Sequence, residues 1–363
     1  MIDHNKVVEI LRTIKDPQSG RDIISAKMVE NFQVDGNNIT FSIVLKTNDS
    51  QLKSSLNFAC MEALQQSYPD ANIHIHLKIN SDNTGESNSV LPQVKNVIAI
   101  ASGKGGVGKS TVAVNLAISL MKKGFRVGLI DADLYGPSIP TMLGLQGQRP
   151  KVELLYGKHK IIPLEAHGIY VMSIGFIVEP EQAVVLRGPR LGGLIKQFIM
   201  DCLWPELDYL VIDLPPGTGD IQLTLVQTIP VTGAVMVTTP QEVAVIDAIK
   251  AMNMFLLPNI QVPIVGVVEN MSWFTPKELP DNKYYIFGQG GGKKLAELAD
   301  SVLLGQIPLV QGVREGGDEG KPVALHNEGI MQVEFSRIAD NLVRQVHIRN
   351  EVMEPTRIVK VEN

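Results

Sequence analysis

The sequence predicts an α/β protein in which a doubly wound, mostly parallel sheet follows a small α+β domain. Apolar runs of strand length alternate with helical patterns over residues 93–350, which is typical of a parallel sheet with helices on both faces. Residues 80–89 are polar and without periodicity, so we place a flexible linker at 81–92. The small domain is then expected at residues 1–80 and a C-terminal tail at 351–363. A chain of 363 residues is long enough for both domains.

The first 80 residues carry the pattern of a small α+β unit. Apolar residues at helical spacing predict helices over residues 7–14 and 52–64. The turn sequence Asp-Gly-Asn-Asn at residues 35–38 predicts a hairpin, and alternating apolar residues at 73–79 predict a last strand.

A glycine-rich turn connects the first strand of the larger domain to a helix. Strand 96–101 leads into the sequence SGKGGVGKST, which opens the helix of residues 112–123. This turn satisfies the phosphate-binding pattern G-x-x-x-x-G-K-[ST] in the required setting, and its backbone N–H groups can turn toward an anion. The predicted nucleotide-binding residues are Gly103, Lys104, Gly105, Gly106, Val107, Gly108, Lys109, Ser110 and Thr111. We expect Lys109 at the β- and γ-phosphates and the Ser110 hydroxyl on Mg²⁺.

Acidic residues end two further predicted strands. Asp131 and Asp133 follow the apolar run 125–130, and Asp213 follows the run 209–212. The carboxyl ends of parallel strands face the ligand crevice, where one carboxylate can hold Mg²⁺-bound water and another can position the attacking water. Asp213 stands in the Walker B arrangement and is expected near Mg²⁺.

A helix start is predicted after the strand at residues 233–238. Thr239 and Glu242 have the spacing of a capping box, and Pro240 stands at the first helical position. The helix is therefore expected to begin at Pro240 and to run to about Leu257.

Lys104 follows the first glycine of the loop and is not required by the general phosphate-binding pattern. A second cation there would stabilise charge on the transferred phosphoryl group. The sequence GKGGVGKST resembles the deviant Walker A loop of the SIMIBI ATPases, which include the nitrogenase iron protein, MinD, ParA and the Mrp/ApbC proteins. The resemblance implies an ATP-dependent homodimer in which Lys104 contacts nucleotide across the dimer interface. Arg187-Gly188-Pro189 resembles a further signature and fits either a solvated turn or a contact at the dimer face.

Other segments resemble the Mrp proteins in particular. Residues 131–138 match their first switch segment, which implies that Asp133 orients the nucleophilic water and that Asp131 supports the metal. Residues 215–220 match their second switch, where glycines permit movement on loss of the γ-phosphate. By the same resemblance, Asn270 recognises adenine through its side-chain amide. The catalytic candidates are thus Lys104, Lys109 and Asp133.

The smaller domain resembles the PaaD-like domain that often precedes an Mrp ATPase domain, on the basis of residues 16–17 and 20–23. Relatives usually carry a cysteine in the segment where this chain reads Lys-Thr-Asn-Asp-Ser at 46–50. Many Mrp relatives also have a C-x-x-C pair after the position of Ser272, and from two subunits it holds a bridging iron-sulfur cluster. This chain reads WFTPKELP at 273–280 instead. The family resemblance nevertheless implies delivery of iron-sulfur clusters to apoproteins.

Few side chains are suited to holding a cluster. Cys60 and Cys202 are the only cysteines, so one chain cannot build a disulfide framework or a four-cysteine metal site. His74 and His76 share one face of a predicted strand, which fits either a solvent face or part of a metal site. We hypothesise that the chain holds a cluster weakly or not at all and acts with a cysteine-bearing partner or client.

Composition limits the other partners. A net charge of -5 and a pI near 5.9 argue against general binding to nucleic acid or to an anionic membrane. The first residues lack the order of a signal peptide, and the apolar runs are too interrupted to span a bilayer, so a cytoplasmic protein is expected.

The predicted function is hydrolysis of ATP to ADP and phosphate with Mg²⁺, which switches a homodimer that carries iron-sulfur clusters. Two alternatives stay open on the sequence. One is a ParA- or MinD-like positioning ATPase that attaches to DNA or membrane, and the other is a nucleotide-dependent scaffold without catalysis.

Overall fold

The computed structural model describes residues 2–15, 22–26, 28–45, 50–69, 71–79, 91–133, 136–155, 158–176, 199–258, 260–276 and 278–353. The chain divides into two compact units, residues 1–87 and 88–363, and the boundary falls inside the predicted linker. Arg187-Gly188-Pro189, residues 16–21 and 46–49, most of the predicted linker and the tail from residue 354 lie outside the described residues.

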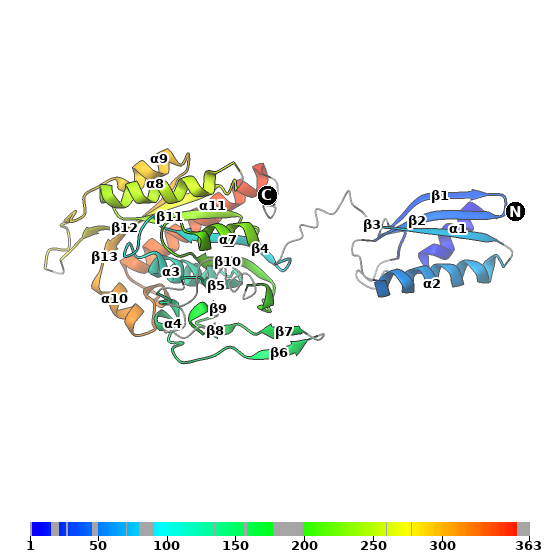
Figure 1. Cartoon of the computed structure of the whole chain (residues 1–363), viewed down its shortest axis with the longest axis horizontal. Helices are drawn as coiled ribbons and strands as arrows, with labels where there is room; N and C mark the ends of the chain where they lie inside the picture. Colours follow the sequence, from blue (N-terminus) through cyan, green and yellow to red (C-terminus); the bar gives the residue numbers. More distant parts are fainter. Residues whose placement is uncertain are drawn as a thin grey trace. The chain divides into compact units, whose positions relative to one another are not determined.

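The first unit is a three-stranded sheet with two helices (Figure 1). Strands β1 (Val29–Asp35) and β2 (Asn38–Leu45) form the predicted antiparallel hairpin, and β3 (Asn72–Ile79) pairs with β2 in parallel. Helices α1 (His4–Arg12) and α2 (Ser50–Ser67) bury their apolar sides against the sheet in one core. Because β3 pairs in parallel with β2, the chain must cross over between them, and α2 makes this connection.

The second unit is built on a sheet with the order β13-β12-β11-β4-β10-β5-β9-β8. Neighbouring strands from β13 to β9 pair in parallel, and β8 is an antiparallel edge strand. The strands are β4 (Val94–Ala101), β5 (Val127–Asp131), β8 (Leu164–Ala166), β9 (Ile169–Ser173), β10 (Leu207–Asp213), β11 (Gly233–Thr238), β12 (Ile264–Phe274) and β13 (Leu303–Leu309). The predicted doubly wound, mostly parallel sheet is confirmed.

Helices cover both faces of this sheet (Figure 1). One face is covered by α3 (Lys109–Lys122) and α11 (Ile330–Val352), and the other by α7 (Asp220–Thr228), α8 (Glu242–Leu256) and α9 (Gly291–Leu298). The remaining elements are α4 (Ile139–Met142), the hairpin β6 (Val152–Leu155) and β7 (Lys158–Ile161), α10 (Gln311–Asp318), and 3-10 turns at Ile174–Phe176 and Val323–Leu325. Helix α11 continues two residues into the predicted tail.

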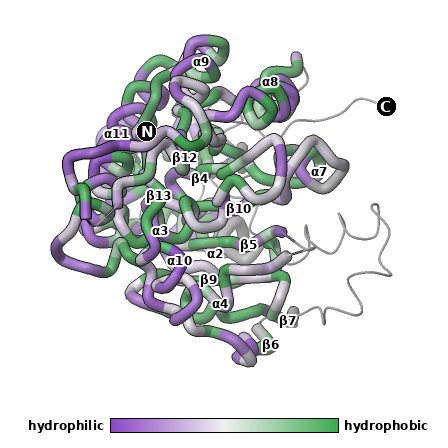
Figure 2. Tube along the Cα trace, turned by 90° about the vertical axis from the view of Figure 1, so that its left-hand side faces the viewer, coloured by the Kyte–Doolittle hydropathy of each residue, from purple (hydrophilic) through white to green (hydrophobic). Residues whose placement is uncertain are grey.

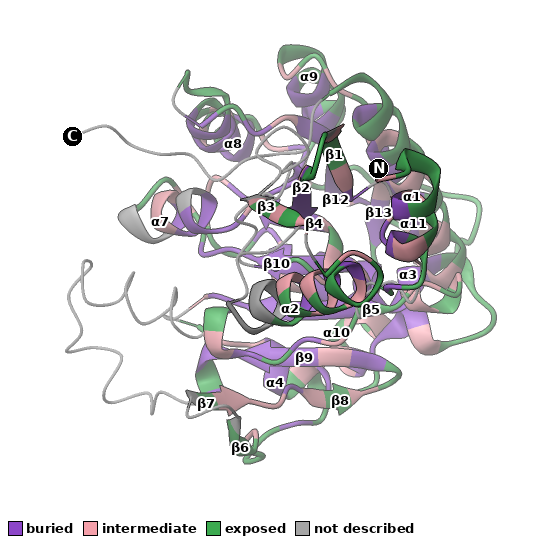
Figure 3. Ribbon diagram, turned by 90° about the vertical axis from the view of Figure 1, so that its right-hand side faces the viewer, coloured by how far each residue is buried: buried purple, intermediate pink, exposed green. Residues whose placement is uncertain are grey.

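Strand β4 shows why the sheet needs two helical layers. Its last five residues are all buried, as expected for a strand covered on both faces. Val97 and Ala99 belong to the core under α7, α8 and α9, whereas Ile98 and Ile100 belong to the core under α3 and α11. Figure 3 shows the same pattern, with buried purple strands inside and exposed green residues on the outer sides of α8 and α9. Figure 2 shows hydrophilic purple stretches along the outer helix α10.

The predicted start of helix α8 is wrong. The helix begins at Glu242 after an extended Gln241, and its N-cap makes no side-chain hydrogen bond. The close approach of α9 explains the later start, because a Cβ on Gly291 would lie 2.6 Å from the Pro240 carbonyl oxygen. The backbone at Pro240 therefore follows this packing instead of the local capping preference.

Candidate active site

The phosphate-binding loop joins β4 to α3 at the carboxyl edge of the sheet. Gly106 and Gly108 have φ angles of 81° and 84°, in the left-handed region that favours glycine. Helix α3 begins at Lys109 without a side-chain cap, so its first N–H groups are available to an anion. The loop thus has the backbone of a phosphate cradle.

Close packing also requires glycine at two positions of this loop, Gly103 and Gly108. A Cβ on Gly103 would lie 2.0 Å from the carbonyl carbon of Asp247 in α8, and a Cβ on Gly108 would lie 2.2 Å from Nδ2 of Asn270. The loop is therefore packed directly on α8 at one end and on the Asn270 side chain at the other.

Lys109, Ser110 and Asp213 form the centre of the site. Lys109 is only 6% exposed, and its Nζ lies 2.6 Å from Oδ1 of Asp213 and 3.8 Å from Oδ2 of Asp133. The Ser110 hydroxyl donates a 2.5 Å hydrogen bond to Oδ2 of Asp213. Burial raises the pKa of Asp213, while the Lys109 ammonium acts in the opposite direction. The predicted lysine, serine and two carboxylates are thus brought together.

Asp131 lies beside Asp213, because β5 and β10 pair the two residues in register. Its Oδ2 accepts hydrogen bonds from the Ser173 hydroxyl at 3.0 Å and from the Ile139 N–H at 3.3 Å, and its Oδ1 accepts one from the Asp133 N–H at 3.1 Å. Burial, reinforced by the charge of Asp213, raises the pKa of Asp131 to about 8. Asp131 therefore ties the loop that carries Asp133 to the end of β9.

The second switch segment is hydrogen-bonded to the phosphate-binding loop. The Gly217 N–H donates to the Ser102 carbonyl at 2.9 Å, and just before the segment the Leu214 N–H donates to the Ile100 carbonyl of β4 at 3.0 Å. Gln222 of α7 donates its side-chain amide to the Pro215 carbonyl. A ligand that moves the loop would therefore act directly on this segment.

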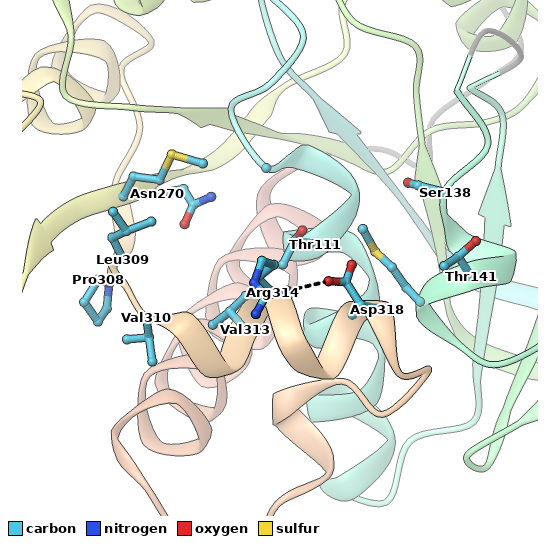
Figure 4. A pocket seen from close by; sticks show the side chains of 14 residues that line it. Thr111, Ser138, Thr141, Asn270, Pro308, Leu309, Val310, Val313, Arg314 and Asp318 are labelled. Carbon is cyan, nitrogen blue, oxygen red and sulfur yellow. Dashed lines mark hydrogen bonds and ion pairs between the residues drawn. The ribbon is translucent and has the colours of Figure 1, made fainter.

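Asn270 lines a cavity of about 400 Å³ next to the loop. Its Nδ2 donates to the Val107 carbonyl at 2.8 Å, which leaves its Oδ1 as an acceptor. Figure 4 shows Asn270 on one side of the cavity, Thr111 near its centre and an ion pair between Arg314 and Asp318 below, at 2.9 Å. The lining residues are Gly108, Thr111, Ser138, Thr141, Met142, Asn270, Met271, Pro308, Leu309, Val310, Val313, Arg314, Gly317 and Asp318.

The side chain of the predicted residue Lys104 does not join this centre. Its half-buried side chain makes no ion pair or hydrogen bond with the described residues. Sequence reasoning missed Ser173 and the segment after β13. Ser173 is a polar residue at the end of an apolar strand, and this signal, which drew attention to Asp131 and Asp213, could have found it.

The fold and this site define the class of P-loop nucleotide-binding proteins. Residues 93–343 match the family model described as NUBPL iron-transfer P-loop NTPase, and residues 4–75 match that of an iron-sulfur cluster assembly protein. The chain belongs to this family of iron-transfer P-loop NTPases, as its resemblance to the Mrp/ApbC proteins predicted.

Three relatives of similar length are each named iron-sulfur cluster carrier protein. The chain is 43% identical over 330 residues to an iron-sulfur cluster carrier protein of Synechocystis, with 90% of this chain and 92% of the relative covered. A Deinococcus radiodurans protein of the same name is 44% identical over 349 residues, which cover 95% and 96%. One from Escherichia coli K12 is 49% identical over 261 residues, which cover 72% and 69%.

Solved structures support the same fold. A nucleotide-binding protein of Archaeoglobus fulgidus in complex with ADP is 35% identical, with a TM-score of 0.56 over 67% of this chain and 94% of that one. The cell division ATPase MinD of Pyrococcus furiosus is 24% identical, with a TM-score of 0.51 over 69% and 98%, and shows the fold alone. Because the family model is that of an iron-transfer NTPase and the relatives are named iron-sulfur cluster carrier proteins, the positioning alternative fits less well than cluster carriage. In the described part of the chain, no helix is both long and apolar enough to cross a membrane.

Proposed function

We propose that this chain hydrolyses ATP to ADP and phosphate and uses the cycle to deliver iron-sulfur clusters to apoproteins. One observation carries the proposal: Lys109, Ser110 and Asp213 meet at a phosphate-binding loop whose neighbouring cavity is lined by Asn270. The names of the relatives support the delivery of clusters.

The residues at the centre fit Mg²⁺ and a triphosphate. The Ser110 hydroxyl and the Asp213 carboxylate are hard oxygen donors already in contact, and Mg²⁺ prefers such ligands. We assign Ser110 and Asp213 to hold the ion, with Asp131 behind them. Bound Mg²⁺ would neutralise charge on the β- and γ-phosphate oxygens. Lys109, now paired with Asp213, would turn its ammonium to those phosphates.

Asp133 is our choice for positioning the attacking water. Its carboxylate lies within 3.8 Å of the Lys109 ammonium, and its backbone is held by Asp131. A carboxylate next to the phosphate-binding cation can orient water toward the γ-phosphate without being a ligand of the metal. This role requires no movement of the strand that ends at Asp131.

Asn270 gives the site a preference for adenine. Because its Nδ2 is engaged by the Val107 carbonyl, its Oδ1 is the atom left to meet a base. An acceptor there can pair with the exocyclic amino group of adenine, whereas guanine presents a carbonyl oxygen at the corresponding position. The proposal therefore includes ATP in preference to GTP.

Lys104 supports a homodimer. Its ammonium makes no ion pair with the described residues of its own chain, although it lies in the same loop as Lys109, whose ammonium is paired with Asp213. We assign it to the nucleotide of a second copy, where it would stabilise charge developing on the γ-phosphate.

The proposal is tested by phosphate release from the purified full chain. We expect steady release with ATP and Mg²⁺, little release when the metal is chelated, and slower release with GTP than with ATP at equal concentration. Nucleotide binding without Mg²⁺-dependent release would contradict the proposal and favour the scaffold alternative.

A further inference from the structure

The cysteine content of the chain conflicts with binding a cluster by itself. A [2Fe–2S] or [4Fe–4S] cluster is ordinarily held by four cysteine thiolates. The chain has two cysteines, Cys60 and Cys202. A homodimer could therefore supply four thiolates only if both cysteines of both copies took part.

Cys60 lies in the core of the first unit. It is 0% exposed on α2 and packs in the cluster of buried residues that includes Phe41 and Leu64. This burial raises the pKa of the Cys60 thiol to about 12. Burial therefore favours the protonated thiol at pH 7, whereas thiolate is the form that binds iron.

Cys202 lies in a different core, in the second unit. It is 5% exposed and packs with Trp204 and Leu207, and its backbone bridges Ile161. Burial raises the pKa of its thiol well above the ordinary value, and the nearby Lys160 opposes this only in part. Both thiols would have to leave packed cores to reach a shared cluster.

Other ligand types do not replace these thiols. Among the described residues, no group of three or more histidine, cysteine, aspartate and glutamate side chains is arranged to hold a metal ion. The predicted pair His74 and His76 is exposed on β3, so the described part of the chain offers two imidazoles there and no third ligand.

Backbone hydrogen bonds and a cation–π contact stabilise the segment after Asn270. Phe274 and Tyr284 exchange backbone hydrogen bonds of 2.9 and 2.8 Å, and the Lys283 ammonium lies 4.0 Å from the centre of the Trp273 ring. At the tip, the Leu279 N–H donates to the Pro276 carbonyl at 3.1 Å. Residues 276 and 279 thus have the spacing of a C-x-x-C turn, but packing and backbone bonds stabilise it.

We propose that this chain holds no iron-sulfur cluster through its own thiolates, and that a cluster on its way to an apoprotein is ligated by cysteines of a separate, cluster-bearing partner. The inference rests on the proposed function, since it concerns how the cargo of that function is bound. The ATPase then acts on a cluster-bearing partner, because the segment after Ser272, where many Mrp relatives have a C-x-x-C pair, contains no cysteine in this chain.

The test is anaerobic loading of the full chain with ferrous iron, sulfide and a thiol reductant, followed by desalting and assays of bound iron and acid-labile sulfide. The Escherichia coli relative, loaded in parallel, shows that the conditions work. We expect wild-type protein to retain no stoichiometric iron. Stoichiometric iron and sulfide in wild-type protein, lost in Cys60→Ala or Cys202→Ala, would overturn the proposal.

A second variant keeps the test informative if those alanine variants fold poorly. Pro276→Cys/Leu279→Cys places two thiols on the hairpin turn, where Leu279 is 46% exposed. We expect this double variant to retain iron and sulfide. If it stays as empty as wild-type protein while the relative loads, the absence of thiols at residues 276 and 279 is not the cause of the empty state, and this part of the proposal fails.

ATP hydrolysis is measured on the same preparations. Absence of hydrolysis would defeat the proposed function, whereas cluster retention with normal hydrolysis would defeat only this inference. Alkylation adds a further readout, because we expect Cys60 and Cys202 to resist iodoacetamide until the protein is unfolded. Rapid labelling of both thiols in the native protein with ATP and Mg²⁺ would count against the inference.

Discussion

Asp213 and Asp131 end neighbouring strands in the same register, yet their carboxylates have different partners. Asp213 contacts Lys109 and the Ser110 hydroxyl, both on the phosphate-binding side. Asp131 accepts hydrogen bonds from the Ser173 hydroxyl and from the backbone N–H groups of Asp133 and Ile139.

A position at the carboxyl edge of the sheet identifies both carboxylates as candidate site residues. The hydrogen-bond donors around each carboxylate then indicate whether it takes part in the chemistry or supports the structure. Asp213 faces a cation and a hydroxyl that a metal and a phosphate can rearrange. Asp131 is hydrogen-bonded to Ser173 of β9 and to the N–H groups of Asp133 and Ile139, so we expect it to position Asp133. Loss of the Asp213 carboxylate should therefore mainly lower the rate of phosphate release. Loss of the hydrogen bonds to Asp131 should mainly lower the free energy of unfolding.

Asp213→Asn should have the largest effect. It removes the charge that faces Lys109 and the proposed metal, so we expect phosphate release to fall by about 100-fold or more. Release is measured at saturating ATP and Mg²⁺, with far-UV circular dichroism to verify folding. The matched control is Asp208→Asn at the other end of β10, and equal turnover in the two variants would remove the distinction drawn for Asp213.

Lys104→Ala should have the next largest effect on turnover. Because its ammonium makes no ion pair with the described residues of its own chain, we expect nucleotide affinity to stay within about twofold while hydrolysis falls by about tenfold or more. Binding is measured by titration with a fluorescent ATP analogue at low protein concentration. A monomeric preparation that loses binding and hydrolysis equally would contradict the assignment to a second copy.

Ser173→Ala probes the Asp131 side of the comparison. It removes the hydroxyl that donates to buried Asp131, so we expect the free energy of unfolding of the second unit to fall by about 1–3 kcal/mol. Urea unfolding followed by tryptophan fluorescence measures the change, since Trp204 and Trp273 lie in this unit. An unchanged midpoint would show that the hydrogen bond does not hold the loop.

Asp208→Asn should have the smallest effect. The pKa of Asp208 is lowered, whereas that of Asp131 is raised. Hydrogen bonds from Lys95 and from the Arg126 N–H lower the pKa of Asp208 to about 2. A lowered pKa stabilises the fold above the unfolded-state value near 4, and this contribution disappears as the pH falls toward 2. We expect Asp208→Asn to remove less than about 1 kcal/mol of stability at pH 7 and to flatten the pH profile between 4 and 2.

Much of this site could be predicted from the sequence because its signals are local. The loop pattern fixes Lys109 and Ser110, and apolar runs ending in acids locate Asp131 and Asp213. A parallel sheet brings such strand ends to one edge whatever the strand order.

The rest depends on contacts that no local pattern encodes. The contact between Ser173 and Asp131 requires β9 to lie next to β5, and the Arg314 side of the cavity requires α10 to follow β13 at the same edge. The start of α8 was mispredicted for a similar reason, because packing by Gly291 overrides the capping preference. The contact between Asn270 and the Val107 carbonyl, on which the proposed preference for adenine rests, is also not encoded locally.

The most direct test of the central claim is phosphate release by Lys109→Ala, compared with wild-type protein and with Lys293→Ala. Lys293 is a matched control because its side chain is 74% exposed on α9 and its only described ion pair is with Glu297 of the same helix. We predict that Lys109→Ala loses Mg²⁺-dependent ATP hydrolysis and most of its affinity for triphosphate, while Lys293→Ala keeps both. Turnover at the wild-type rate in folded Lys109→Ala would contradict the assignment of this loop as the site of ATP hydrolysis.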